Sequence, residues 1–375
     1  MIRTGFDTAR CVVVKAGSSL LQAGDAVIAA IVADIVVLRS RGVRVTLVSS
    51  GAVALGRERL GLPRGSLSLE QKQAAAAAGQ PRLLDLWARA FAPHGIVTAQ
   101  ALLTLDVTES RRSWLNARAT LETLLELGAV PIVNENDTIA TDEIRYGDND
   151  RLAARVAQLT GADLLVLLSD VAALHDADPR TTTSARPLHD IAAIDAAIHA
   201  MAGEANSAAG VGTGGMRTKI LAAELAGGSG CATAIALGTA TNPVLSLERS
   251  DHGSWFHPAR SSANARERWI SGVVSRNGAI RIDDGARRAL ANGKSLLPVG
   301  VQAVEGQFER GETIRILAAD GSLIARGVSA YSADDARRVA GCRSDEAEAR
   351  LGYRRSAALI HTDDIVPVAA ADPEG

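Results

Sequence analysis

Glycines and basic residues crowd into the stretch GVGTGGMRTK, from Gly210 to Lys219, and crowding of this kind is typical of loops that bind phosphate. Gly210, Gly212 and Gly215 match the dinucleotide-binding spacing. However, no strand pattern precedes them and no acidic residue follows at the distance that the ribose requires. A Walker A loop is excluded because Lys219 does not directly follow a glycine. The stretch therefore predicts a glycine loop leading into a helix whose start favours an anion, with a surface linker as the alternative.

Lysine is rare in this chain, which makes its positions informative. Of 40 basic residues only four are lysines, at positions 15, 72, 219 and 294. Lys15 closes the apolar run CVVVK and is followed by Ala-Gly-Ser-Ser. A charge at the end of a buried strand is costly unless it is paired or faces a ligand, and the alternative is that Lys15 reaches solvent past the strand end. Lysine and arginine are not interchangeable in a tight site, so Lys15 and Lys219 are candidate ligand contacts.

Polar side chains also follow three other apolar runs. Ser49, Ser50 and Gly51 come after one run, and Ser169 and Asp170 come after another. The segment 133–151 follows a third and contains six acidic residues and three asparagines. Such groups could bind a small anion, grip an ammonium group or help to position Mg²⁺. The alternatives are ordinary turns and a solvated acidic loop.

These residues need a fold that brings the ends of separate strands together. Continuous apolar, β-branched runs alternate with Ala- and Leu-rich helical patterns through residues 10–245. That alternation predicts an α/β fold with a mainly parallel sheet sandwiched by helices, in which ligands bind at the carboxyl ends of the strands. The strands are expected at 11–14, 43–49, 96–100, 129–134, 163–168 and 231–237. Helices are expected at 26–41, 74–78, 113–127, 149–159 and 217–227.

The pattern changes near residue 276, where short apolar runs separated by Gly and Asp-Gly turns begin. We therefore expect two domains, an α/β catalytic domain over 1–265 and a small β-rich domain over 276–360. The segment 255–269 is the expected linker.

Composition excludes several classes of protein. The 375 residues are 47% hydrophobic and carry a net charge of −2, so neither nucleic acid nor membrane attraction is indicated. Three widely spaced cysteines suit neither a disulfide framework nor a zinc site. The first apolar run is interrupted by Lys15, and no run is long enough to span a bilayer, which predicts a cytoplasmic protein.

Taken together, the motifs VVVKAGSS, LVSSGAVALGR, PIVNENDTIATDEIRYGDNDRLAA, LLSD, ADPR and GTGGMRTK resemble the amino-acid kinase family over roughly residues 10–365. The combination of NEND, GDND and GTGGM-x-TK is similar to the branch of this family that phosphorylates glutamate and appends a PUA domain. The resemblance implies ATP-dependent transfer of phosphate to the γ-carboxylate of L-glutamate, the first step of proline biosynthesis. One departure is ALHDADPR, where His175 stands in place of a tyrosine that the family usually has near the nucleotide.

The resemblance also implies roles for individual residues. The ATP contacts would be Lys15, Ser169, Asp170 and the run Thr213, Gly214, Gly215, Met216, Arg217, Thr218 and Lys219. Ser50, Asp137 and Asn149 would contact glutamate, and Asp150 would organise the two lysines. Lys15, Asp150 and Lys219 are thus the expected catalytic residues, and the carboxylates that contact Mg²⁺ are not identified.

The same resemblance implies Mg²⁺ as cofactor, a homo-oligomer, feedback inhibition by proline and coupling to glutamyl-phosphate reductase. Two other functions remain open at this point. One is a different small-acid or nucleotide kinase of the same fold. The other is RNA binding through the PUA-like end, although residues 276–355 carry 14 basic and 11 acidic side chains, a net charge of only +3.

Overall fold

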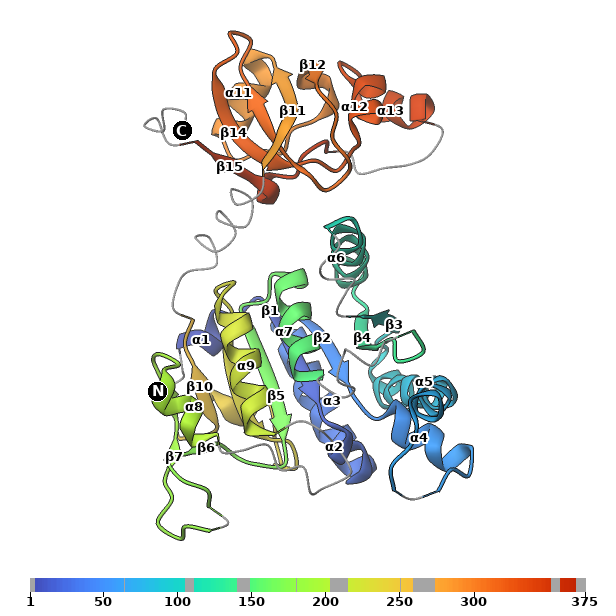
Figure 1. The fold of residues 1–375 in the computed structure, drawn as a ribbon, viewed down its shortest axis with the longest axis vertical. Coiled ribbons are helices and arrows are strands. Elements are labelled where there is room, and N and C mark those ends of the chain that lie inside the picture. The colour runs from blue at the N-terminus through green and yellow to red at the C-terminus, as the bar shows by residue number, and fades with distance from the viewer. Residues whose placement is uncertain are drawn as a thin grey trace. The chain divides into compact units, whose positions relative to one another are not determined.

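The chain forms two compact units, Met1–Ser262 and Ala263–Gly375, in a computed structural model (Figure 1). The structure describes residues 4–63, 65–104, 111–139, 149–179, 181–202, 215–249, 251–258, 274–351 and 358–368. No helix among these residues is both long enough and apolar enough to cross a membrane.

An eight-stranded sheet forms the centre of the first unit, in the order β3-β4-β2-β1-β5-β9-β10-β8. The pairings from β3 through β9 are all parallel, whereas β10 runs antiparallel to β9 and parallel to β8. The strands are β1 (Cys11–Ala16), β2 (Arg44–Ser49), β3 (Thr98–Leu103), β4 (Val130–Glu135), β5 (Leu164–Ser169), β8 (Asp190–Ile191), β9 (Ala232–Leu237) and β10 (Ser254–Phe256). A separate hairpin pairs β6 (Leu174–His175) with β7 (Pro187–Leu188).

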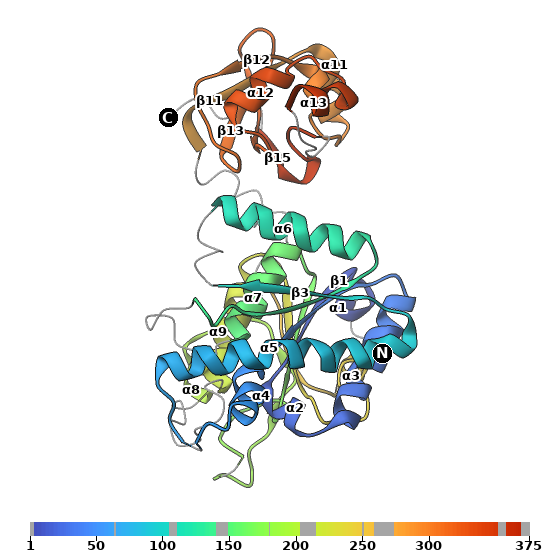
Figure 2. The same ribbon diagram turned by 90° about the vertical axis from the view of Figure 1, so that its right-hand side faces the viewer.

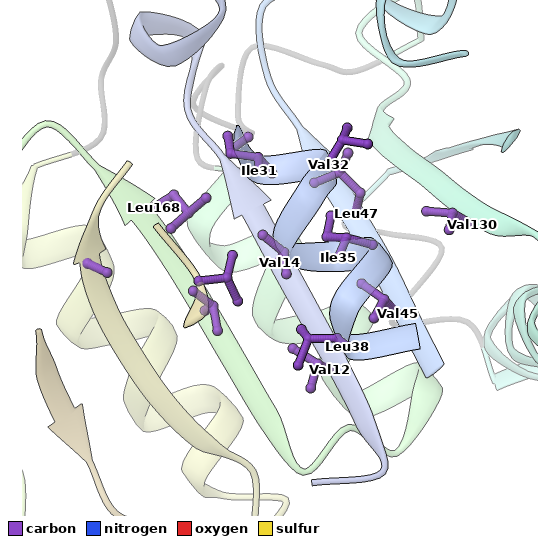
Figure 3. Packing of buried hydrophobic residues seen from close by; sticks show 14 of the residues in the cluster. Val12, Val14, Ile31, Val32, Ile35, Leu38, Val45, Leu47, Val130 and Leu168 are labelled. Carbon is purple, nitrogen blue, oxygen red and sulfur yellow. The ribbon is translucent and has the colours of Figure 1, made fainter. Parts of the chain in front are cut away.

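Helices cover both faces of this sheet, which explains why its central strands are apolar throughout. One face packs on α2 (Ser18–Gln22), α3 (Asp25–Ser40) and α5 (Leu69–Phe91), and the other on α6 (Arg111–Glu126), α7 (Asn149–Thr160) and α9 (Met216–Gly227). Figure 3 shows the first of these cores, where Ile31 and Ile35 of α3 lie against Val14 and Leu47. Among the described residues of this unit, the other helices are α1 (Thr4–Asp7), α4 (Ala52–Arg59), α8 (Ala196–Met201) and the 3₁₀ turns Ala92–His94 and Leu245–Glu248.

Side chains of β1 alternate between the two cores. Val12, Val14 and Ala16 face α3, whereas Cys11 and Val13 face α7 and α9. Because the side-chain period of a strand is two, Lys15 belongs to the same face as Val13. The strand therefore presents its one charged residue toward the helices α7 and α9.

Helices α4 and α5 approach each other unusually closely through two glycines (Figure 2 shows α5 along its length). A Cβ atom built on Gly56 would lie 1.7 Å from the carbonyl oxygen of Ala75, and one on Gly79 would lie 1.9 Å from that of Ala52. Real side chains do not tolerate such distances, so both positions require glycine. The contact fixes α5 against the helix that directly follows β2.

The second unit contains a five-stranded sheet with its own hydrophobic core. Its order is β12-β11-β13-β14-β15, built from β11 (Val274–Ile282), β12 (Val301–Glu305), β13 (Thr313–Leu317), β14 (Leu323–Val328) and β15 (Ile365–Pro367). The helices are α11 (Asp284–Ala291), α12 (Ala333–Val339), α13 (Ser344–Leu351) and the 3₁₀ turns Pro298–Gly300 and Thr362–Asp364. Short strands with intervening turns agree with the β-rich pattern expected here.

The mainly parallel sheet between helices is confirmed, and one detail of the sequence prediction is wrong. Residues 255 and 256 were expected in the linker, but Trp255 and Phe256 are buried in β10 as part of the sheet. A three-residue strand is too short for its pattern to be distinguished from a loop, which explains the error. Residues 259–269 of the expected linker lie outside the described residues.

We predict that Gly79→Ala strongly destabilises the first unit, because the new methyl group would force α4 and α5 apart. Overpacking of this kind should lower the free energy of unfolding by about 3 kcal/mol or more. Differential scanning calorimetry of the purified variant measures the effect. Gly227→Ala at the end of α9 is the matched control, because its Cβ would meet only Pro258 Cα at 3.7 Å. Equal melting temperatures for Gly79→Ala and the wild type would refute the interpretation of the helix contact.

Candidate active site

A buried carboxylate between two lysines lies at the carboxyl edge of the parallel sheet. Asp150 Oδ1 is 2.7 Å from Lys15 Nζ, and Asp150 Oδ2 is 3.1 Å from Lys219 Nζ. Lys15 is 7% exposed, Lys219 5% and Asp150 1%. The three residues come from β1, the first turn of α9 and the first turn of α7. The fold thus brings together the three expected catalytic residues, which are far apart in the sequence.

The charges of this triad do not cancel. Burial would raise the pKa of Asp150, but the ammonium groups of Lys15 and Lys219 outweigh it and hold the pKa well below its usual range. Asp150 is therefore ionised, and one negative charge stands against two positive ones. A surplus positive charge in a water-poor site is unfavourable until an anion arrives, and it attracts that anion strongly.

The start of α9 lies beside the same carboxylate. The Thr218 hydroxyl is 2.8 Å from Asp150 Oδ2 and also 2.8 Å from the carbonyl oxygen of Gly215. Gly215 precedes the twelve-residue helix and supplies no side-chain cap. The N–H groups of the first turn of a helix have no partner within the helix, and together with the helix dipole they favour a phosphate. Lys219 within that turn adds a full positive charge.

A second polar group, without net charge, surrounds Asn149. Asn149 Nδ2 donates to Ser50 Oγ at 2.7 Å and to Asn134 Oδ1 at 3.2 Å, which uses both of its hydrogens. Asn149 Oδ1 is buried and accepts no hydrogen bond from any residue that the structure describes. Since Ser50 Oγ accepts from Asn149, its own proton is free to be donated onward. The group therefore offers an incoming ligand one acceptor and one donor.

Asp137 follows β4 at the same edge and is 8% exposed. Burial raises the pKa of its carboxyl group from an ordinary value of 3.8 to about 6. A buried carboxylate without full solvation is suited to pair with a ligand cation, because that cation would restore the stabilisation which water no longer provides.

The other expected site residues differ in exposure. Ser169 is buried at the end of β5 and donates to Asp170 Oδ1 at 3.0 Å, and Asp170 itself is exposed. Arg217 is exposed, and Met216 packs partly into the core between the sheet and α7 and α9. Thr213, Gly214 and residues 140–148 of the acidic loop lie outside the described residues.

Sequence reasoning missed several residues that support this site. Asn134 was visible in the NEND motif but received no role, although it holds Asn149. Gln80 on α5 donates to the carbonyl oxygen of Glu135 at 3.3 Å, and Trp87 on the same helix donates to Ser49 Oγ at 2.9 Å. No local pattern marks Gln80 or Trp87, because both lie in a helical stretch whose contacts with β2 and β4 exist only after folding.

Among the described residues, no group of three or more His, Cys, Asp or Glu side chains is placed to hold a metal ion. Mg²⁺ does not require such a group, because it commonly takes one or two carboxylates and completes its shell with substrate phosphates and water.

The fold and the site define a phosphate-transferring α/β protein with a cationic centre at the edge of a parallel sheet. The amino acid kinase family model matches residues 10–236, and the PUA domain model matches residues 278–351. The chain belongs to the amino acid kinase family.

Three similar relatives are named glutamate 5-kinase. The glutamate 5-kinase of Caulobacter vibrioides (strain NA1000 / CB15N) is 52% identical over 366 residues, covering 96% of this chain and 97% of the relative. The glutamate 5-kinase of Ruegeria sp. (strain TM1040) is 53% identical, with 96% and 99% covered. Glutamate 5-kinase 1 of Rhizobium meliloti (strain 1021) is 51% identical, with 98% and 94% covered.

We predict that Asp137→Asn raises thermal stability at neutral pH. Because the folded-state pKa of Asp137 lies above its unfolded value, ionising it destabilises the folded protein, and the penalty is complete above about pH 6. The variant should melt at a higher temperature than the wild type at pH 7 to 8, and the difference should vanish as the pH falls below about 4.

Melting curves collected across this pH range measure the effect. Asp85→Asn, at an exposed position on α5, is the control and should show no such pH-dependent gain. A melting temperature for Asp137→Asn below that of the wild type at pH 8 would show that the ionised Asp137 stabilises the fold, and it would contradict this prediction.

Proposed function

We propose that this chain transfers the γ-phosphoryl group of ATP to the γ-carboxylate of L-glutamate, giving ADP and L-glutamyl 5-phosphate, the first step of proline biosynthesis. The observation that carries the proposal is the Lys15–Asp150–Lys219 triad beside the uncharged Ser50–Asn149–Asn134 group. Membership in the amino acid kinase family and relatives of about half identity named glutamate 5-kinase support it.

The cationic half of the site is proposed to bind ATP. Lys15 and Lys219 would meet the phosphate oxygens, and Asp150 would hold both ammonium groups in place. The loop and helix start from Thr213 through Lys219 would supply backbone N–H groups to the triphosphate. Ser169 and Asp170, at the end of β5, would contact the nucleotide from the neighbouring strand.

The uncharged half is proposed to bind glutamate. The Ser50 hydroxyl would donate to a substrate carboxylate, while Asn149 Oδ1 and the carboxylate of Asp137 would accept from the α-ammonium group. The α-ammonium group would thus give Asn149 Oδ1 the hydrogen bond that it lacks among the described residues, and it would stabilise the poorly solvated carboxylate of Asp137. An amino acid with both ends charged thus fits this half better than a nucleotide base does.

The reaction needs little chemistry from the protein. A γ-carboxylate with an ordinary pKa of about 4.3 is already ionised at neutral pH, so no general base is required. The obstacle is repulsion between that carboxylate and a polyanionic triphosphate. Phosphoryl transfer is accelerated mainly by positioning and by charge stabilisation, which two compact ammonium groups provide. The product is an acyl phosphate that water destroys, so a closed site also protects it.

Mg²⁺ is proposed to accompany ATP, and the residues at this edge fit it. Bound there, the ion would supply charge neutralisation at the phosphate oxygens. Asp150 is already paired with two lysines, so the protein ligand of Mg²⁺ would be a carboxylate outside the triad. The exposed Asp170, which directly follows β5, is the candidate among the described residues.

The remaining expectations stay predictions. They are inhibition by proline at the glutamate site, assembly into a homo-oligomer, coupling to glutamyl-phosphate reductase, a cytoplasmic location, and a role for the PUA domain, including RNA binding.

The proposed reaction is tested with purified protein, Mg-ATP and hydroxylamine, which traps an acyl phosphate as a hydroxamate. L-Glutamate should give ADP and hydroxamate in equal amounts, whereas aspartate, acetylglutamate and UMP should give little above background. Absence of hydroxamate with glutamate would refute the proposal, and turnover with another acceptor would assign the chain to a different substrate within the family.

We further predict that Lys15→Ala and Lys219→Ala each lower kcat by roughly 10²–10³ while changing the KM for glutamate far less. Each variant leaves Asp150 paired with the other lysine, so the fold should survive the loss. Lys219→Arg should also fail, because a planar guanidinium cannot take the place of a compact ammonium beside a glycine loop.

Steady-state kinetics in both substrates measure these effects. Lys294→Ala is the control, since Lys294 is exposed in the second unit, and its kcat should stay within about twofold of the wild type. A near-normal kcat with a raised glutamate KM in Lys219→Ala would make Lys219 a glutamate-binding residue and contradict its proposed role.

A further inference from the structure

A buried tryptophan on α5 is hydrogen-bonded to the end of β2. Trp87 is 0% exposed, and its Nε1–H donates to Ser49 Oγ at 2.9 Å. The alternation of β2 accounts for the meeting, because Val45 and Leu47 face the core that contains α5 and Ser49 continues that face. A buried indole N–H needs an acceptor, and here the acceptor is the hydroxyl of Ser49, the residue directly before Ser50.

The contact continues toward the candidate site. Having accepted from Trp87, Ser49 Oγ donates its own proton to the carbonyl oxygen of Ser50 at 3.2 Å. The Ser50 N–H is in turn bound to the carbonyl oxygen of Ala16 at 3.1 Å. The two peptide groups that flank the Ser50 side chain are therefore each held by a hydrogen bond, one of which depends on Trp87.

Gly51 permits the turn that follows Ser50. Its φ of 114° lies in the region that glycine adopts readily, and a Cβ there would fall 2.4 Å from Leu21 Cδ1. This conformation turns the chain directly from Ser50 into α4. Ser50 lies between Ser49 and Gly51, and its side chain points toward Asn149, from whose Nδ2 its hydroxyl accepts a hydrogen bond at 2.7 Å.

A purely structural role does not require this chemistry. Trp87 packs in the apolar core between the sheet and α5, where a hydrocarbon ring would bury similar area without needing a hydrogen-bond partner. Ser49 is likewise 0% exposed, and the other two β2 side chains on its face of the sheet, Val45 and Leu47, are aliphatic. The indole N–H of Trp87 and the hydroxyl of Ser49 are paired inside this apolar core, which indicates that their hydrogen bond serves to orient the end of β2.

We propose that Trp87 is a positioning residue that acts through Ser49 to set the Ser50 hydroxyl for the carboxylic substrate. The inference rests on the proposed function, in which Ser50 contacts glutamate. The nucleotide half of the site lies on the other face of the sheet, with Lys15, α7 and α9, and does not use this contact.

The experiment measures KM for glutamate, KM for ATP and kcat in Trp87→Phe and Ser49→Ala. Each variant breaks the same link, so each should raise the glutamate KM about tenfold, as loss of roughly one hydrogen bond implies, with the ATP KM within about twofold. The double variant should resemble the single ones rather than show the product of their effects, because both residues belong to one interaction.

Two controls separate positioning from general loosening of the core. Ser49→Thr keeps the hydroxyl and should retain a near-normal glutamate KM. Trp255→Phe removes an equally buried indole on β10, where Trp255 packs edge-on against Phe6, and should lower the melting temperature without changing the glutamate KM.

The outcomes are distinct from those that test the reaction itself. If the wild type forms no hydroxamate from glutamate, the proposed function fails. The positioning role is then tested on the same variants with the KM for the acceptor that the wild type does phosphorylate. If the wild type turns over but Trp87→Phe and Ser49→Ala keep its glutamate KM, the positioning role is wrong. Equal changes in both KM values and kcat, or the same change in Trp255→Phe, would also overturn it, because they would show a global effect.

Discussion

The site depends on one carboxylate that is buried between two lysines. Asp150 keeps two ammonium groups in a region with little water, which neither lysine could enter alone without a large desolvation penalty. It also leaves them under-neutralised by one charge. The same interaction therefore stabilises the site without ligand and makes it attractive to a polyanion, and it connects β1, α7 and α9 through charged groups.

Around that ion pair the sheet separates two kinds of recognition. Lys15 and Lys219, on the face of α7 and α9, are cationic and suit phosphate, whereas the ends of β2 and β4 present amides, a hydroxyl and the poorly solvated Asp137. The two halves meet at the start of α7, where Asn149 belongs to one and Asp150 to the other. In the proposed reaction, these adjacent residues of a single helical turn would bring the glutamate site and the phosphate site together, which is the main requirement of a transfer with little covalent chemistry.

Helix α5 gives the substrate half a rigid support. Gln80 and Trp87 lie about two turns apart, so they share a face of the helix, and they reach the ends of β4 and β2 respectively. The glycine contact between α4 and α5 holds this helix at a fixed distance from the segment that follows Ser50. Site precision of this kind comes from residues that touch no ligand, because the rotamers and peptide groups of the contacting residues must themselves be restrained.

The sequence by itself determined the parallel sheet, because β-branched runs such as CVVV and DLLVLL have no polar face and must be covered on both sides. It also determined the candidate residues at the strand ends, since Lys15, Ser50 and Ser169 each follow an apolar run. The family roles of Asp150 and Lys219 came from resemblance. Only the tertiary structure decided that Asp150 lies within 3.1 Å of both lysines, that β10 joins the sheet through Trp255 and Phe256, and that Trp87 reaches Ser49. The physical reason is that local patterns record burial and periodicity, whereas these contacts join segments that are distant in the chain and acquire their energies only when packing removes water from between them.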